Sequence, residues 1–129
     1  MLLDFCSQCI LSDSGYHVIK RLKIGGEGGW DYLTADGTAR RLYISHGTYA
    51  MLVDIDTGEI IGDILDTRGI HGITIAPELN CGFTSNDKSG MSTIFDLKTL
   101  KIIGEVKTGK NPDAILYDPS SRRVFVFNG

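Results

Sequence analysis

The stretch IHGITIAPELNCGFTSND, residues 70–87, decides the fold because two other parts of the chain repeat it. The matching segments, which align with it without a gap, are WDYLTADGTARRLYISHG (residues 30–47) and PDAILYDPSSRRVFVFNG (residues 112–129). One column holds Asp31, His71 and Asp113, at steps of 40 (31 to 71) and 42 (71 to 113). A fixed internal period of this length indicates a repeat architecture, in which each unit is one supersecondary motif.

The second half of the unit also repeats, because MLVDIDTGEIIGDIL from Met51 aligns with TIFDLKTLKIIGEVK from Thr93 at a step of 42. Each unit contains four short apolar runs separated by turn residues, which predicts four strands. The predicted strands are 31–35, 42–46, 50–56 and 59–65 in the first unit, 72–76, 82–86, 91–97 and 101–107 in the second, and two in the third, ending at 124–127. The outer strand of a preceding unit is predicted over 16–24, where HVIKRLKI matches EIIGDIL and KIIGEVK.

Four strands per unit and a period of about 40–45 residues are typical of β-propeller blades. The sequence therefore predicts an all-β fold of four-stranded antiparallel meanders, arranged as an incomplete ring of about two and a half blades. Residues 16–129 form the predicted partial propeller domain. Residues 1–15 are expected to be a disordered N-terminus or the remnant of a leader, with a short extra strand as the alternative.

The second strands LYISH, GFTSN and VFVFN resemble the YVTN-type repeat of YncE-like β-propellers. In that family the blade has a D-G or P-D-G turn followed by L-Y-V-[ST]-N, and the resemblance covers about residues 16–129. His46 departs from the usual Asn, and Cys81-Gly82 departs from the usual basic–apolar pair. The resemblance implies the fold and a periplasmic or secreted location, although the chain shows no convincing signal peptide.

Propellers close with about four to eight blades, and each blade buries its faces only against its neighbours. We therefore expect either that the chain is a fragment of a longer protein or that it completes a ring by oligomerisation. Open strand edges also predict self-association.

The composition, 42% hydrophobic and 22% charged with a net charge of -3, is typical of a soluble globular protein. No segment concentrates basic residues, so no nucleic-acid partner is expected. No apolar run is long enough for a membrane span.

The three cysteines predict neither a disulfide framework nor a cofactor site. Cys6 and Cys9 form a lone C-x-x-C, and a zinc site would require a second pair where the chain offers only Cys81. A c-type haem would require His after the second Cys, and that position is Ile10. We interpret Cys6 and Cys9 as incidental thiols and expect no cofactor.

The candidate site lies where the innermost strands of adjacent blades begin, around the mouth of the central channel. The predicted ligand-binding residues are Trp30, Asp31, His46, His71, Asn86 and Asp113. Gly47, Asp87 and Asn128 are expected nearby. Such a polar surface with one large aromatic residue suits a small polar ligand or a cation. The alternative is that Asx and His side chains at strand ends only satisfy backbone groups. No ligand spacing supports a metal centre.

Two classes of function remain open from the sequence. The first is a non-catalytic ligand-binding or protein-binding module, because no catalytic constellation is visible. The second is an enzyme, since propellers similar to this one include cofactor-linked oxidoreductase subunits and lactonase-like hydrolases. A group of arginines on the opposite face is interpreted as solvated turn charges, with an acidic partner as the alternative; it comprises Arg40, Arg41, Arg122 and Arg123.

Overall fold

The computed structural model describes residues 15–26 and 28–129, which form three antiparallel sheets. The first sheet comprises β1 (Trp30–Asp36), β2 (Arg41–His46), β3 (Tyr49–Asp54) and β4 (Ile60–Ile64). The second comprises β5 (Ile70–Ala76), β6 (Cys81–Asn86), β7 (Met91–Asp96) and β8 (Ile102–Lys107), and the third β9 (Pro112–Asp118) and β10 (Arg123–Asn128). The short 3-10 helix η1 (Pro77–Leu79) joins β5 to β6. Among the described residues, no helix is both long and apolar enough to span a bilayer.

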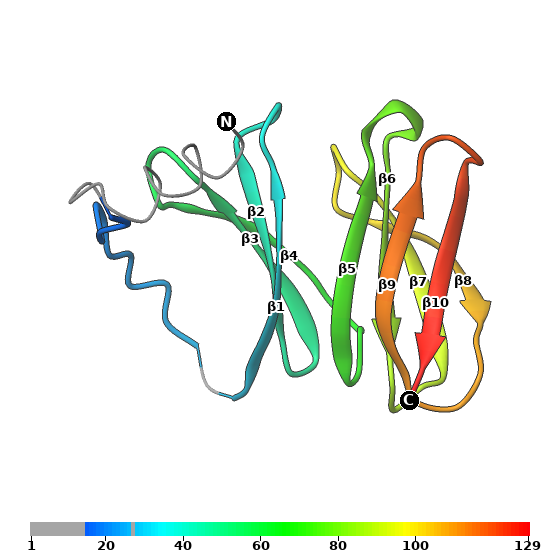
Figure 1. Ribbon diagram of the computed structural model, residues 1–129. Coiled ribbons are helices and arrows are strands. Elements are labelled where there is room, and N and C mark those ends of the chain that lie inside the picture. The colour runs from blue at the N-terminus through cyan, green and yellow to red at the C-terminus, as the bar shows by residue number, and fades with distance from the viewer. Residues whose placement is uncertain (1–14, 27) are drawn as a thin grey trace, which may run out of the picture.

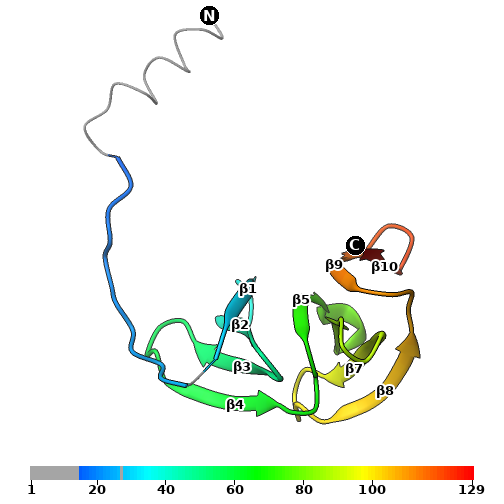
Figure 2. The same cartoon turned by 90° about the horizontal axis from the view of Figure 1, so that it is seen from below.

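Strands pair in chain order within each sheet, and the three sheets stand side by side as blades (Figure 1). Seen along the axis, β1, β5 and β9 lie next to one another on the inner side, whereas β4 and β8 lie on the outer side (Figure 2). The predicted all-β fold and incomplete β-propeller are confirmed. The described blades do not close a ring.

Aspartates at repeated positions form the turns between strands. Asp36 Oδ1 accepts hydrogen bonds from the backbone N–H groups of Thr38 (3.0 Å) and Ala39 (2.9 Å), and Asp118 does the same in the third blade. Asp54 and Asp96 hold the turns between the third and fourth strands in the same way. Such Asx turns satisfy backbone donors locally, so these positions repeat for a structural reason.

The main hydrophobic core lies between the first and second blades. Its buried side chains come from both blades: Tyr43, Ala50, Leu52, Ile64, Ile70, Ile73, Phe95 and Leu97. Polar contacts also join the inner strands. Thr34 Oγ1 donates to the carbonyl of Ile73 (2.6 Å), and the hydroxyl of Thr74, in the same repeat column, accepts from the N–H of Tyr117 (3.1 Å).

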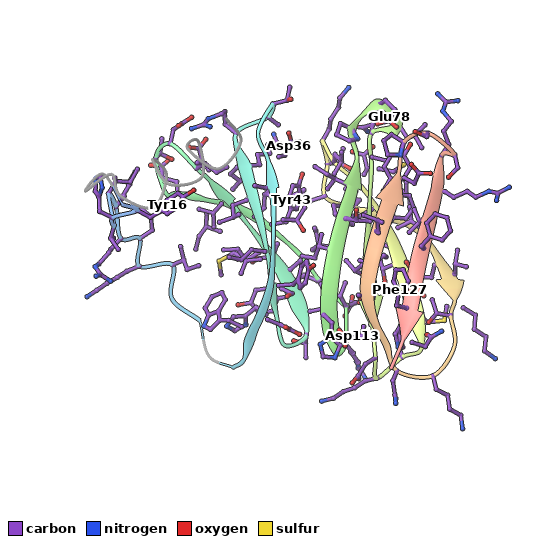
Figure 3. All side chains as sticks on the ribbon, viewed as in Figure 1. Tyr16, Asp36, Tyr43, Glu78, Asp113 and Phe127 are labelled. Carbon is purple, nitrogen blue, oxygen red and sulfur yellow. The ribbon has the colours of Figure 1, made fainter. Side chains whose placement is uncertain are left out.

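The predicted leading strand over 16–24 is wrong, because this segment has no regular structure. As the outer strand of a preceding blade, it would need the third strand of that blade to pair with, and no such strand lies among residues 15–26 and 28–129. The segment instead passes over the first blade, where Lys20 Nζ donates to the carbonyl of Asp56 (2.7 Å) and Ile24 packs against the cluster of Ile44, Met51 and Val53. Tyr16 is fully exposed (Figure 3).

A β-bulge opens the innermost strand of each blade. The register shifts between Trp30 and Leu33 in β1 and between Ile70 and Ile73 in β5, and the third blade has a similar irregularity. A serine of the second strand fills each of the first two bulges. Ser45 Oγ accepts from the N–H of Tyr32 (2.6 Å), and Ser85 Oγ accepts from the N–H of Gly72 (2.9 Å). The side-chain hydroxyl thus replaces the ladder partner that the bulge removes.

Replacing Ser85 by Ala should lower the free energy of unfolding by about 1–3 kcal/mol, because the buried N–H of Gly72 loses its acceptor. Chemical denaturation of both proteins measures this. The exposed Ser120 in the third-blade turn is the matched control, and its change to Ala should stay within about 0.5 kcal/mol. Equal effects of the two substitutions would contradict the role given to the bulge serine.

The purified chain should self-associate at micromolar concentration. The outer edge of β10 is unpaired, and Leu116, Phe125 and Phe127 of the third blade are exposed (Figure 3). An unpaired strand edge beside apolar side chains promotes pairing between chains. Sedimentation velocity measures the distribution of species, and a single monomeric species across the concentration series would be the contrary result.

Candidate functional site

The bulges bring the repeat column of Asp31, His71 and Asp113 to one end of the blades. Asp31 and His71 lie inside the bulges of β1 and β5, where a bulge redirects a side chain away from the sheet ladder. Asp113 lies at this same end, opposite to Asp36 and Glu78 (Figure 3). The three equivalent positions therefore lie at the same end of the inner strands, with Asp31 and His71 in contact.

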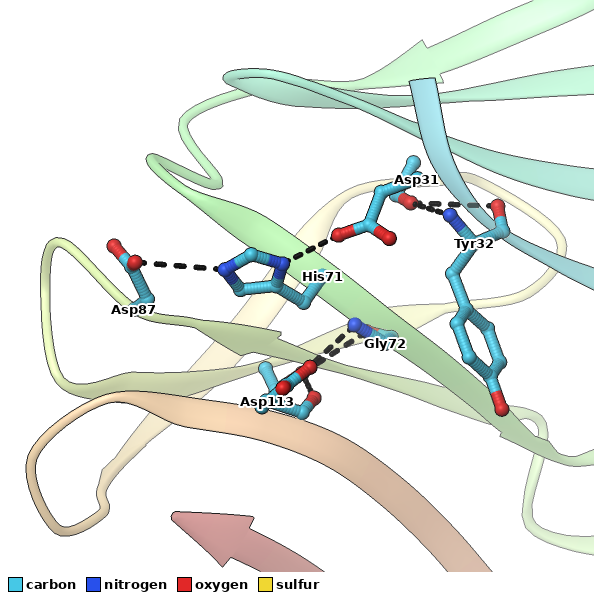
Figure 4. Close-up of polar contacts among 8 residues, drawn as sticks. Asp31, Tyr32, His71, Gly72, Asp87 and Asp113 are labelled. Atoms are coloured by element: carbon cyan, nitrogen blue, oxygen red, sulfur yellow. Dashed lines mark hydrogen bonds and ion pairs between the residues drawn. The ribbon is translucent and has the colours of Figure 1, made fainter. Parts of the chain in front are cut away.

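His71 connects the first blade to the second. Its Nδ1 pairs with the carboxylate of Asp31 on β1, and its Nε2 lies 3.4 Å from Oδ2 of Asp87 (Figure 4). About a third of the His71 side chain (34%) is exposed, so the contact is open to solvent. Asp113 does not bond to the ring but lies close enough to contribute to its electrostatics.

The surrounding carboxylates favour the protonated imidazolium form of His71. The hydrogen bond to Asp31 is the largest cause that raises the pKa of His71, and the bond to Asp87 and the charge of Asp113 act in the same direction. Partial burial of the ring opposes them. The two carboxylates thus keep the imidazolium form of His71 favoured to a higher pH than in an isolated histidine.

A glycine permits the approach of the loop that carries Asp87. Gly69 has φ 70°, and a Cβ at this position would lie 2.6 Å from Oδ1 of Asp87. The N–H of Asp87 also donates to the carbonyl of Gly69 (2.9 Å). Both the left-handed conformation and the close contact require glycine at this position. Gly69, just before β5, thus allows the loop that carries Asp87 to lie beside His71.

A shallow cleft of about 290 Å³ accompanies this cluster. It lies between the starts of β1 and β5 and is lined by Gly29, Trp30, Asp31, Gly47, Gly69, Ile70, His71, Asp87 and Lys88. Trp30 is 45% exposed and forms an apolar wall next to the carboxylates. Asp87 was expected near the site from the sequence, although no contact was predicted for it. Lys88 was not expected, because it lies on the β6–β7 turn just beyond the aligned repeat segments.

His46 was expected around the mouth, but the structure buries it beneath Trp30. Its side chain is 1% exposed, and its ring meets that of Trp30 edge-on at a centroid distance of 3.9 Å. Tyr49 packs on the ring at 4.9 Å. Side chains alternate between the two faces of a strand, and His46 points away from the second blade into this aromatic contact. It supports Trp30 rather than contributing to the polar surface.

Asn86, also expected at the mouth, is buried within the second blade. Only 1% of it is exposed, its Nδ2 donates to Thr93 Oγ1 (2.8 Å), and its Oδ1 accepts from Thr84 (2.9 Å). Its hydrogen bonds are satisfied internally, as is usual for buried polar side chains. Asn86 therefore has the structural role that the sequence left open as the alternative, because its side chain satisfies polar groups inside the blade.

Of the three cysteines considered in the sequence, the structure describes only Cys81, and it does not line the cleft beside His71. Cys6 and Cys9 lie outside the described residues, and Cys81 is a free, half-buried thiol on β6. Within the described residues, no three His, Cys, Asp or Glu side chains are placed to hold a metal ion.

The contacts of His71 differ from those of a catalytic histidine. A catalytic histidine keeps one ring nitrogen for its orienting carboxylate and the other for the reacting group. Both nitrogens of His71 face carboxylates here. Ser85 is engaged in its bulge with Gly72 and with the carbonyl of Asp113.

The arrangement of the sheets defines the class of the protein: four-stranded up-and-down blades side by side around an axis are the architecture of a β-propeller. No model of a known protein family matches the sequence, and no curated protein does.

Solved structures that are similar to this chain support the class. They include the hydrazine synthase of Kuenenia stuttgartiensis (TM-score 0.73, 21% identity, 89% of this chain and 32% of that chain). They also include apo AztD from Citrobacter koseri (TM-score 0.60, 17% identity, 87% of this chain and 32% of that chain). The glutaminyl cyclase of Myxococcus xanthus is similar as well (TM-score 0.55, 19% identity, 83% of this chain and 53% of that chain). The chain thus spans about a third of the first two proteins and half of the third. At these identities the likeness shows the fold alone.

The junction between the first two blades should weaken as the pH rises. Protonated His71 has a raised pKa in the folded protein, so its contribution is complete below the unfolded-state value of 6.5 and is lost as pH rises through the folded-state pKa. Thermal unfolding of the natural protein and of His71→Gln should therefore differ most near pH 5.5. By pH 9 the two should lie within about 1 kcal/mol.

Asp31→Asn is the partner control for this experiment, because it removes the first carboxylate while keeping the size of the side chain. It should reduce the pH dependence in the same direction. Parallel stability curves for all three proteins from pH 5.5 to 9 would show that the ion pair does not join the blades.

Proposed function

We propose that this chain is a non-catalytic ligand-binding β-propeller module whose channel-mouth cleft takes a small organic cation. The observation that carries the proposal is the Asp31–His71–Asp87 cluster beside the exposed ring of Trp30. The carboxylates supply negative charge, and an indole face attracts cations within about 6 Å of the ring.

Charge balance supports a cationic ligand over an anionic one. The cluster contains three carboxylates, Asp31, Asp87 and Asp113, and His71 and Lys88 are the basic side chains beside them. Deprotonation of His71 leaves the cluster more negative. A cationic ligand could replace the imidazolium charge between the carboxylates, so we expect binding to strengthen as the pH rises.

The finer family assignment is part of the same proposal. We assign the chain to the YVTN-type, YncE-like repeats, and the second strands LYISH, GFTSN and VFVFN support this assignment. The bulge serines Ser45 and Ser85 give the Ser/Thr position of that motif a structural role in two of the three blades. An enzyme of the propeller class, such as an oxidoreductase subunit or a lactonase-like hydrolase, is the alternative function, and the doubly paired His71 favours the binding module.

Choline and its uncharged analogue 3,3-dimethyl-1-butanol test the proposal. Trp30 is the single tryptophan of the chain, so intrinsic fluorescence reports on the cleft directly. Choline should change the emission of Trp30 in a saturable manner, because its trimethylammonium group makes a cation–π contact with the indole beside the carboxylates. The neutral analogue, which has the same shape, should not.

Asp31→Asn should weaken choline binding by roughly tenfold, the effect expected for one ion-pair contact at a partly desolvated site. Asp63→Asn, on the exposed outer strand β4, is the matched control and should leave binding unchanged. Equal responses to choline and the neutral analogue would exclude a cation site.

A further inference from the structure

A second cleft lies at the opposite end of the junction between the first and second blades. Its volume is about 310 Å³, and residues of both blades line it. The first blade contributes Asp36, Arg41 and Tyr43, and the second contributes Pro77 and Leu97. It is separate from the channel mouth, because Asp36 marks the opposite end of the blades from Asp113 (Figure 3).

A buried hydroxyl without a partner lies at this cleft. Tyr43 is fully buried, and its hydroxyl oxygen has no hydrogen-bond partner among the described residues. Burial raises the pKa of Tyr43, and the guanidinium of Arg41, which lies near the hydroxyl without completing a hydrogen bond of good geometry, opposes that shift. Leaving a buried polar group unsatisfied costs about 1–3 kcal/mol, so such a group in a folded protein requires an explanation.

The repeat shows that the fold does not need this hydroxyl. The column of Tyr43 is occupied by Phe83 in the second blade and by Phe125 in the third, and both strands form with the same register as β2. Packing therefore requires an aromatic ring here and no oxygen. The hydroxyl is a feature of the first blade alone, at the junction where the cleft lies.

The charged groups of the cleft favour an anion. Arg41 donates one hydrogen bond, to the carbonyl of Leu97 (2.9 Å), which leaves other donors of its planar guanidinium available. Lys98 at the rim is exposed. Asp36 is the single carboxylate among the lining side chains, and its Oδ1 already accepts two backbone N–H groups of its own turn.

We propose that this inter-blade cleft binds a small organic carboxylate, with the carboxylate on Arg41 and the hydroxyl of Tyr43 and the apolar body against Pro77 and Leu97. Arginine recognises carboxylates through paired N–H donors, and a tyrosine hydroxyl adds a further donor. The volume is at the lower end of the range for ligand pockets, which fits a molecule with one ring or a short chain.

Benzoate and its neutral isostere benzamide are the probes, and equilibrium dialysis measures their binding to the purified chain. Benzoate should bind saturably with at least roughly tenfold preference over benzamide, because only the anion pairs with Arg41. Arg41→Gln should weaken benzoate binding about tenfold or more, and Tyr43→Phe should weaken it several-fold. Circular dichroism checks that both variants fold, and Phe83 shows that the column accepts phenylalanine.

Arg123→Gln is the matched control, since Arg123 occupies the column of Arg41 in the third blade and does not line the cleft. It should leave benzoate binding unchanged. Absence of saturable binding would overturn the proposal. So would equal affinity for benzoate and benzamide, or binding that survives both Arg41→Gln and Tyr43→Phe.

Discussion

A sheet with apolar side chains on both faces is stable in water only when other structure covers both faces, and this constraint organises the protein. At the first junction, Tyr43 and Leu52 of one blade and Phe95 of the next are fully buried against each other. Gly82, the cross-strand neighbour of Phe95 within the second blade, leaves room for that ring, since a Cβ there would lie 2.1 Å from it. Both candidate sites lie at the two ends of this packed junction, so each depends on the same burial.

The repeat allowed most of the fold to be predicted, because its signals are local. Turn aspartates such as Asp54 and Asp96 act within a few residues, and alternating apolar residues mark each strand. The strand over 16–24 could not be judged this way. Its sequence suits an outer strand, but a strand also needs a free edge beside it, and that is a property of the assembled blades.

The candidate site was predictable in part for the same reason. Equivalent positions in repeated units lie at the same end of their blades, so the shared column was enough to place Asp31, His71 and Asp113 together (Figure 4). The burial of His46 and Asn86 depends on which face the last residue of a strand occupies, and a bulge changes that relation between neighbouring strands. Gly72 within β5 was a possible signal, since glycine inside a strand often marks a bulge. The hydroxyl of Tyr43 gave no signal, because an alignment of Tyr with Phe reads as one apolar column.

The pairing of strands in chain order has a kinetic consequence. Every ladder in the first two blades joins neighbouring strands through a turn of a few residues, so a blade can form from fewer than 40 consecutive residues without waiting for distant chain. Proteins dominated by such short-range pairings reach the folded state faster than those whose strands meet across the whole sequence. A chain of this kind can add blades one at a time as it leaves the ribosome, each new blade docking on the exposed face of the one before it.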